Sequence, residues 1–377
     1  MILSPEHQML RDTVRQYARE QLAPNAAAWD RDATFPKEAL KGLAAMGLYG
    51  IAIAEEWGGA GMDHTALALA LEEIAAGDGS TSTIVQVNNL AAGILAGYGT
   101  AAQKERYLKP LARGDMLGAF ALTEPHAGSD AAAIRTRAER SGDSWALHGV
   151  KQFITSGKHA DLAIVFALTD RNAGKKGISA FIVPTATPGY IVSRIEEKTG
   201  QHASDTAQIT LETCKVPADH MLGAEGEGYR IALANLESGR INVAAQSVGM
   251  AQAALNAALT YAGERTSFGK PLIGHQAVAF RLADMATAIE AARQLYLHAA
   301  ALRDRGLPCL KEASMAKLFA SEAAERICSD AIQIHGGYGY VRDFPVERIW
   351  RDVRVTQIYE GASDIQRMVI GRALAGS

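Results

Sequence analysis

This sequence contains few cysteines and has a net charge close to zero. The 377 residues include only three cysteines, Cys214, Cys309 and Cys328, which are odd in number, far apart and in no metal-ligand spacing. Such a set predicts no disulfide framework and fits a reducing compartment, so we expect a cytoplasmic protein. Lysine and arginine number 38 against 41 acidic residues, which gives a net charge of −3 with the two signs interspersed. That balance provides no footprint for nucleic-acid binding.

A lipid-facing segment is also missing. Two long stretches lack charge, Gly79 to Gln103 and Ile241 to Gly263, yet both contain asparagine or glutamine, which a lipid-facing helix would hold at a cost. The first turns of the chain carry Glu6, Arg11 and Asp12, so they do not resemble a secretory signal. We expect no membrane span, and we expect the two uncharged stretches to be buried helices of a large α-helical domain.

Hydrophobic periodicity divides the chain into three parts. Residues 1–117 show helical spacing, and within them Ser4-Pro5-Glu6 opens a helix that Pro24 is expected to end. Residues 118–225 hold short apolar runs bounded by turn residues, which predicts a small antiparallel β-domain, a sandwich or a barrel. Residues 226–377 return to long helical patterns with short connections, typical of an antiparallel, four-helix-like bundle. We therefore expect an α+β fold that is mainly helical, with these three parts as its domains.

A carboxylate stands immediately before a glycine near the end of the chain, in Tyr359-Glu360-Gly361-Ala362-Ser363, and a helix is expected to follow. Glycine lets the backbone come close to a ligand. A glutamate held at such a turn could act as a general base if desolvation raises its pKa towards neutrality. The alternative is a solvated acid before a helix N-terminus, where a negative charge is mildly favourable.

Two segments at the start of the β-rich part could contact a flat ligand. Ala121–Asp130 gathers hydroxyls, backbone donors and a flexible glycine, which could hydrogen-bond a planar heterocycle or a phosphate. Lys151–Gly157 ends a strand with Phe153 two positions before Thr155, so a ring could lie against a cofactor while the hydroxyl donates to its edge. The alternatives are a polar turn that joins two domains, and a core phenylalanine beside a strand-ending threonine.

Glu264–Pro271 joins two helices and suits a pyrophosphate, because Arg265 can bind bidentately beside two hydroxyls. The segment resembles a P-loop only superficially. Its glycine spacing is one residue too long, and Pro271 stands where a Mg²⁺-binding serine or threonine should be. Nucleotide hydrolysis is therefore disfavoured.

Gln333–Tyr340 follows a helix and is rich in glycine. The glycines permit close backbone approach, and Gln333 offers a donor and an acceptor to an adenine edge. Alternatively, Gly336 could be only a helix C-cap. His335 has no second ligand at metal spacing, so we expect no metal site.

Together and in this order, these segments resemble the acyl-CoA dehydrogenase family over essentially the full length. The matched segments are Ala121–Asp130, Lys151–Gly157, Glu237–Arg240, Arg265–Gly269, Gln333–Gly337 and Tyr359–Arg367. The resemblance implies non-covalently bound FAD and oxidation of an acyl-CoA to its trans-2-enoyl-CoA. Glu360 matches the family's base, which removes the α-proton while a hydride leaves the β-carbon for flavin N5.

The resemblance also implies partners and a substrate class. It implies an obligate dimer within a homotetramer, and an electron-transferring flavoprotein as the electron acceptor. Gly239–Ala244 and Ala121–His126 look most like the short-chain and branched-chain members. A short straight or branched acyl-CoA is therefore the expected substrate.

Roles for single positions follow from the same resemblance. Thr123 and Thr155 should hydrogen-bond the isoalloxazine, with Phe153 stacked near it. The same site would be lined by Leu122, Gly128 and Ser129. The adenosine diphosphate half of FAD, held by a neighbouring subunit, would contact Arg265, Phe268, Gln276, Gln333, Gly336 and Gly337, and further FAD contacts match Ala362 and Asp364. The substrate-binding positions are matched by Ser129, Glu237, Arg240 and Gly361.

Three departures from the family pattern bear on these roles. Phe153 stands where many members have tryptophan, which should alter flavin stacking without abolishing it. Ala362 replaces a common threonine and Asp364 a common glutamate or glutamine, so the contacts of that turn to FAD stay open. Gly239 occupies the position that holds the base in some relatives, so Glu360 has no competitor there.

Two other classes of function stay open. One is a flavin enzyme of the same fold with other chemistry, such as a two-component monooxygenase or a nitroalkane oxidase. Monooxygenase members generally lack the glutamate and nitroalkane oxidase uses an aspartate, so Glu360 argues against both. The other is a non-enzymatic helical scaffold, which would purify without flavin absorbance.

Overall fold

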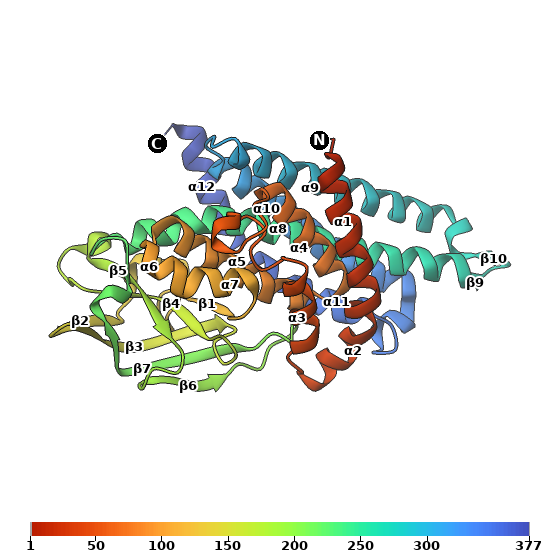
Figure 1. Cartoon of the computed structure of the whole chain (residues 1–377). Helices are drawn as coiled ribbons and strands as arrows, with labels where there is room; N and C mark the ends of the chain where they lie inside the picture. Colours follow the sequence, from red (N-terminus) through yellow and green to blue (C-terminus); the bar gives the residue numbers. More distant parts are fainter. Residues whose placement is uncertain (1, 377) are drawn as a thin grey trace.

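The computed structural model describes residues 2–376 and arranges them as helices, then a sheet, then helices (Figure 1). This order confirms the expected fold, an α+β chain that is mainly helical. The first helical part contains α1 Pro5–Tyr17, α2 Ala23–Asp32, α3 Lys37–Ala45, α4 His64–Gly77, α5 Gly79–Tyr98, α6 Ala101–Gln103 and α7 Lys109–Arg113, with π-helical segments η1 Ala18–Leu22 and η3 Lys104–Leu108.

Pro24 does not end the first helix, and that expectation is wrong. After α1 the chain widens into η1, where the Ala23 N–H donates to the Ala18 carbonyl, and α2 then begins with Pro24 at its second position. Proline has no N–H to donate, and the wider π-helical turn lets the helix continue past it. The helix ends instead at Ala33, whose φ of 48° is left-handed and whose N–H donates to the Trp29 carbonyl.

Helix α5 is buried on nearly every side, as its lack of charge predicts. All residues from Gly79 to Ala92 are buried. The helix begins at Asp78, whose carboxylate accepts the Thr81 N–H at 2.8 Å and so caps the first turn. Within residues 2–376, no helix is long and apolar enough to cross a membrane.

The middle part forms one sheet in which most neighbours are antiparallel. Its strands are β1 Gly118–Ala121, β2 Arg137–Ser141, β3 Ser144–Thr155, β4 Leu162–Leu168, β5 Ile178–Pro184, β6 Tyr190–Ile195, β7 Thr206–Pro217 and β8 Met221–Leu222. The strand order is β6-β7-β3-β2-β4-β5-β8, with β1 beside β4. The pairing of β1 with β4 is parallel, as is a single residue pair between β2 and β4.

Strand β4 is buried on both faces, because alternate residues enter two different cores. Ala163 and Val165 pack into a core shared with α1, α3 and α4. Leu162, Ile164 and Phe166 pack into a second core shared with α5 and the start of α8. The centre of the sheet therefore lies between helices, and β1 and β3 also contact α5.

Long helices make up the last part, and a small hairpin joins two of them at the far end of the molecule (Figure 1). The elements are α8 Gly228–Glu264, β9 Thr266–Ser267, β10 Lys270–Pro271, α9 Gln276–Asp304, α10 Leu310–His335, α11 Val346–Val353 and α12 Ser363–Ala375. Alanine dominates the core between α8, α9 and α10. Helix α8 also crosses α4 closely, since a Cβ on Gly249 would lie 2.0 Å from the Glu72 carbonyl oxygen.

Candidate active site

A cavity of about 1040 Å³ lies where α5, the ends of β1 and β3, α8 and the turn before α12 meet. Ten of the residues singled out in the sequence line it. They are Leu122, Thr123, Gly128, Ser129, Phe153, Thr155, Glu237, Arg240, Glu360 and Gly361. Segments separated by more than two hundred positions in the sequence thus form one site, as their expected roles require.

The turn that carries Glu360 has an unusual backbone. Glu360 has a φ of 56° and Gly361 a φ of 93°. A residue with a side chain in the left-handed region costs about 1–3 kcal/mol and persists only where its surroundings hold it. Here the Gly361 carbonyl accepts from Lys317 Nζ and from Gln366 Nε2, both at 2.8 Å. These two donors hold the strained turn in place.

The two carboxylate oxygens of Glu360 have different surroundings. Oε1 accepts from Gln86 Nε2 at 3.1 Å, whereas Oε2 is buried and has no hydrogen-bond partner. Oε2 also lies close to α8, because a Cβ built on Gly239 would stand 2.4 Å from it. Glycine at this position therefore leaves the space that Oε2 occupies. An unpaired buried acceptor beside a cavity is free to take a proton from a bound ligand.

Burial raises the pKa of Glu360, and three groups oppose that rise. These are, in order of effect, the hydrogen bond from Gln86 and the positive charges of Arg240 and Lys317. Arg240 is itself buried, with Nε and Nη1 unpaired, and burial lowers its pKa. The site therefore combines a carboxylate of raised basicity with two nearby cations.

A buried ion pair holds the cavity wall formed by the segment after β1. Lys151 Nζ on β3 donates to Glu124 Oε1 at 2.8 Å and to the Leu122 carbonyl at 3.0 Å. Glu124 also accepts the N–H groups of Arg135 and Thr136 at 2.6 and 3.0 Å. The pair therefore fixes the loop that contains Thr123 against the end of β3.

Phe153 presents its ring to the cavity from a strained backbone. Its φ is 59° and the side chain is 62% exposed. A positive φ at a bulky residue is an outlier, and an exposed aromatic ring beside a cavity is available for stacking. Thr123 and Thr155, on neighbouring segments, line the same cavity. This wall fits a flat heterocyclic ligand, so Phe153 is not the core residue of the alternative interpretation.

The residues expected to contact the adenosine diphosphate half of FAD lie outside this cavity. Arg265, Phe268, Gln276, Gln333, Gly336 and Gly337 are all exposed, and the cavity lining contains none of them. They lie around the β9–β10 hairpin and the end of α10. The Arg265 guanidinium stands 5.7 Å from the Tyr338 ring centroid, which brings these two segments together. The Phe268 side chain is 97% exposed.

Ala362 and Asp364 precede and begin α12, and neither lines the cavity. Asp364 is exposed and accepts from Arg367 at 3.4 Å on its own helix. Glu237 lines the cavity, but its carboxylate already accepts from Arg303 at 3.3 Å and from Cys309 at 3.2 Å.

Sequence reasoning missed Gln86, Lys317 and Gln366, which contact the Glu360 turn directly. Gln86 had one visible signal, since it is a polar residue inside a helix predicted to be buried. Lys317 is likewise a lone cation within the alanine-rich run of α10. Neither signal says which distant segment the side chain contacts.

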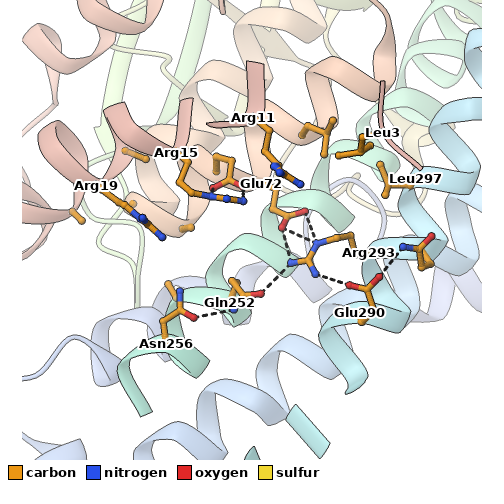
Figure 2. Close-up of a pocket in the computed structure, with 18 residues that line it drawn as sticks. Leu3, Arg11, Arg15, Arg19, Glu72, Gln252, Asn256, Glu290, Arg293 and Leu297 are labelled. Atoms are coloured by element: carbon orange, nitrogen blue, oxygen red, sulfur yellow. Dashed lines mark hydrogen bonds and ion pairs between the residues drawn. The ribbon is translucent and has the colours of Figure 1, made fainter. Parts of the chain in front are cut away.

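A second cavity, of about 530 Å³, lies between α1, α4, α8 and α9 (Figure 2). Arg293 Nη2 donates to Glu72 Oε1 at 2.8 Å, and Arg15 Nη2 donates to Glu73 Oε1 at 2.6 Å. The Tyr296 hydroxyl also donates to Glu72. These acids are satisfied by the protein itself, so we assign the cluster to the joint between the helices rather than to the active site.

Comparison with known proteins places the chain in a family. Models described as the N-terminal, middle and C-terminal domains of acyl-CoA dehydrogenase match residues 4–115, 119–214 and 226–375. An acyl-CoA dehydrogenase of Bacillus subtilis is 47% identical over 377 residues, covering 100% of both chains. The mitochondrial short-chain specific acyl-CoA dehydrogenase of Homo sapiens is 48% identical over 376 residues, covering 100% of this chain and 91% of that protein.

A solved structure agrees with these relatives. Butyryl-CoA dehydrogenase from Megasphaera elsdenii superposes with a TM-score of 0.97 at 42% identity, covering 100% of this chain and 99% of that one. Similarity of this extent spans the helical parts, the sheet and the cavity between them. The chain therefore belongs to the acyl-CoA dehydrogenase family and is an FAD-dependent oxidoreductase.

Proposed function

We propose that this chain oxidises a short straight or branched acyl-CoA to the trans-2-enoyl-CoA, with Glu360 as the base that removes the α-proton. The observation that carries the proposal is the state of Glu360 Oε2, which is buried beside the cavity and has no hydrogen-bond partner. The alternative, a solvated acid before a helix, does not explain a buried carboxylate on a strained turn.

The surroundings of Glu360 suit proton abstraction. Gln86 holds Oε1 and so fixes the orientation of the carboxylate, whose Oε2 has no partner. Burial raises the pKa of Glu360, which makes it a stronger base than a solvated carboxylate. The backbone N–H of Glu360 would hydrogen-bond the thioester carbonyl and acidify the α-proton, which is oxyanion-type stabilisation.

The residues around the cavity would hold FAD. When bound, FAD accepts the hydride that leaves the β-carbon. Thr123 and Thr155 would donate to its ring edge and Phe153 would lie against its face. Leu122, Gly128 and Ser129 would line the same wall, with Ser129 reaching the CoA arm.

Arg240 is the group best suited to orient the acyl-CoA. Its Nε and Nη1 are buried and unpaired, so they could donate to polar atoms of the substrate near the thioester. Glu237 Oε1 already accepts from Arg303 and Cys309. We therefore assign Glu237 to positioning that end of the cavity, and Arg240 to direct contact.

The short-chain preference rests on the proposed activity and on the names of relatives. Relatives at 48% and 42% identity are named short-chain specific and butyryl-CoA dehydrogenases. Residues from α5 and α8, including Leu90 and Leu236, form apolar walls of the cavity. These walls suit the apolar part of an acyl chain.

The exposed group at the far end supports a site completed by a second subunit. Phe268 is almost fully exposed, and Arg265, Gln276 and Gln333 are exposed beside it. We propose that they hold the adenosine diphosphate half of a neighbouring subunit's FAD in a homotetramer. We also propose a cytoplasmic location, in keeping with the free, buried cysteines Cys214, Cys309 and Cys328, and an electron-transferring flavoprotein as the acceptor.

A panel of acyl-CoA thioesters tests the reaction and the substrate class. We expect anaerobic bleaching of the flavin band by butyryl- or isobutyryl-CoA, and formation of the matching enoyl-CoA. A higher kcat/KM for palmitoyl-CoA would refute the short-chain assignment. Peroxide formation at the turnover rate would point to an oxidase rather than to transfer to a flavoprotein.

A further inference from the structure

A buried lysine contacts the turn that carries Glu360, and the proposed reaction does not use it. Lys317 belongs to α10, and its side chain is 0% exposed. Its Nζ donates to the Gly361 carbonyl oxygen at 2.8 Å. Within residues 2–376, no carboxylate oxygen lies within 4.0 Å of this Nζ.

An ammonium group buried in this position is unfavourable for the stability of the fold. Burial lowers the pKa of Lys317 to about 8, while the charge of Glu360 opposes that fall. Burying a charge without a paired, hydrogen-bonded partner is unfavourable, and an apolar side chain of similar size is often as stable or more so. Stability therefore gives no reason for a lysine at this place.

The contact with Gly361 supplies a reason. The Gly361 carbonyl receives two donors from two different helices, Lys317 from α10 and Gln366 from α12. Gln366 Nε2 also approaches the Glu360 carbonyl, at 3.3 Å. Glu360 and Gly361 both have positive φ, so the direction of their carbonyl groups depends on these contacts.

We propose that Lys317 is a positioning residue for the base. Its ammonium group fixes the Gly361 carbonyl, and with it the turn that holds the Glu360 carboxylate at the cavity, while its positive charge favours the ionised carboxylate. This inference rests on the proposed role of Glu360 as the base. Lys317 does not touch the reacting atoms, so it acts only through the turn and through charge.

The electrostatic part of the proposal depends on all charged neighbours. Four charged or titratable groups lie near Glu360 and Lys317. They are Arg240 and Glu237 on α8, Glu322 on α10 and Tyr359 on the turn itself. The contacts from α5 and α12 are neutral, namely Gln86 and Gln366. Arg240 remains when Lys317 is replaced. Loss of Lys317 should therefore move the titration of Glu360 to higher pH without removing it.

Three substitutions separate the hydrogen bond from the charge. Lys317→Met removes both, Lys317→Gln keeps a polar group without charge, and Lys317→Arg keeps the charge with a different reach. Lys311→Met is the matched control, because Lys311 lies on the same helix with its side chain 40% exposed and pairs with Glu312. The control should leave kcat and the pH profile unchanged.

We expect Lys317→Met to fold and keep FAD, because Gln366 still donates to the Gly361 carbonyl. Its kcat should fall by about 10- to 10²-fold through misplacement of the base, with little change in KM. The acid limb of its pH profile should move to higher pH. A merely structural lysine would not predict that shift, and Lys317→Arg, which keeps the charge, should keep the wild-type limb.

An infrared titration gives a readout that needs no turnover. The carboxyl band of Glu360 is identified by its loss in Glu360→Gln, and it should titrate at higher pH in Lys317→Met than in the wild type. A folded Lys317→Met protein with an unchanged kcat and an unchanged titration of Glu360 would overturn the proposal. If Lys317→Met does not fold, the same two measurements on Lys317→Gln decide. A wild type that oxidises no acyl-CoA would refute the proposed function, while the infrared shift would still test Lys317.

Discussion

The position of the Glu360 carboxylate depends both on the hydrogen bonds that single neighbouring residues make and on the space that they leave free. The carboxylate sits on a left-handed turn, with Oε1 held by Gln86 and Oε2 unpaired. Oε2 occupies space that any side chain on Gly239 would fill. The base and the glycine across from it therefore form one geometric unit, although they lie 121 positions apart.

Gly239→Ala tests that unit. A Cβ at this position would stand 2.4 Å from Oε2, so the carboxylate must move. We expect retained FAD and a kcat lowered by about 10²-fold, the size of effect that a misplacement of about 1 Å can cause. Stopped-flow reduction of the flavin measures it. Gly97→Ala is the control, because a Cβ on Gly97 meets nothing within 4 Å, and equal rates in the two variants would contradict the account.

At the scale of elements, two buried acids lie where α11 meets the start of α5. Asp352 on α11 accepts the Gln201 N–H, and its carboxylate lies near Asp78, which caps α5 through Thr81. Burial, and then the charge of Asp78, raise the pKa of Asp352 to about 7. The charge of Asp352 also acts on Tyr359, the residue before Glu360.

The raised pKa predicts how stability depends on pH. Unfolded, Asp352 titrates near its ordinary value of 3.8, but in the fold it holds its proton up to about pH 7. The folded protein therefore binds more protons between these values, and its stability falls as pH rises from about 4 to 7. Asp352→Asn keeps the acceptor for Gln201 without titrating. Its melting temperature should fall less between pH 5 and pH 8 than that of the wild type, and parallel curves would refute the assignment.

Local patterns and tertiary contacts differ in what the sequence can reveal. The motif residues of the cavity were predictable, because Phe153, Thr155 and Glu360 lie in short segments with recognisable spacing. Pro24 was misread, because its effect depends on a π-helical turn that no local pattern announces. The contacts of Gln86 and Lys317 with the Glu360 turn join positions 274 and 44 apart in sequence. They exist only once the helices pack.

At the scale of the whole molecule, the cavity and the exposed segment Glu264–Pro271, which suits a pyrophosphate, lie apart. The β9–β10 hairpin stands at one end of the long helices and α12 towards the other (Figure 1). One chain therefore does not bring Arg265 and Phe268 to its own cavity. This arrangement is accounted for if each chain completes the FAD site of a neighbour.

The assembled protein should purify yellow, as a homotetramer with about one FAD per chain. Arg265→Ala removes a charge-assisted bond to the pyrophosphate, worth about 1.5–3 kcal/mol, so FAD retention should weaken. Light scattering combined with flavin absorbance measures both quantities. A stable monomer with full FAD occupancy would contradict a site shared between subunits.

The central claim is that Glu360 is the base, and anaerobic stopped-flow reduction of Glu360→Gln tests it most directly. Glutamine keeps the size and polarity of the side chain but has no basic oxygen. The variant should fold, hold FAD and bind acyl-CoA, yet bleach the flavin band about 10²–10⁴-fold more slowly than the wild type, as expected for the loss of a general base. Reduction within a few-fold of the wild-type rate would mean that the base lies elsewhere.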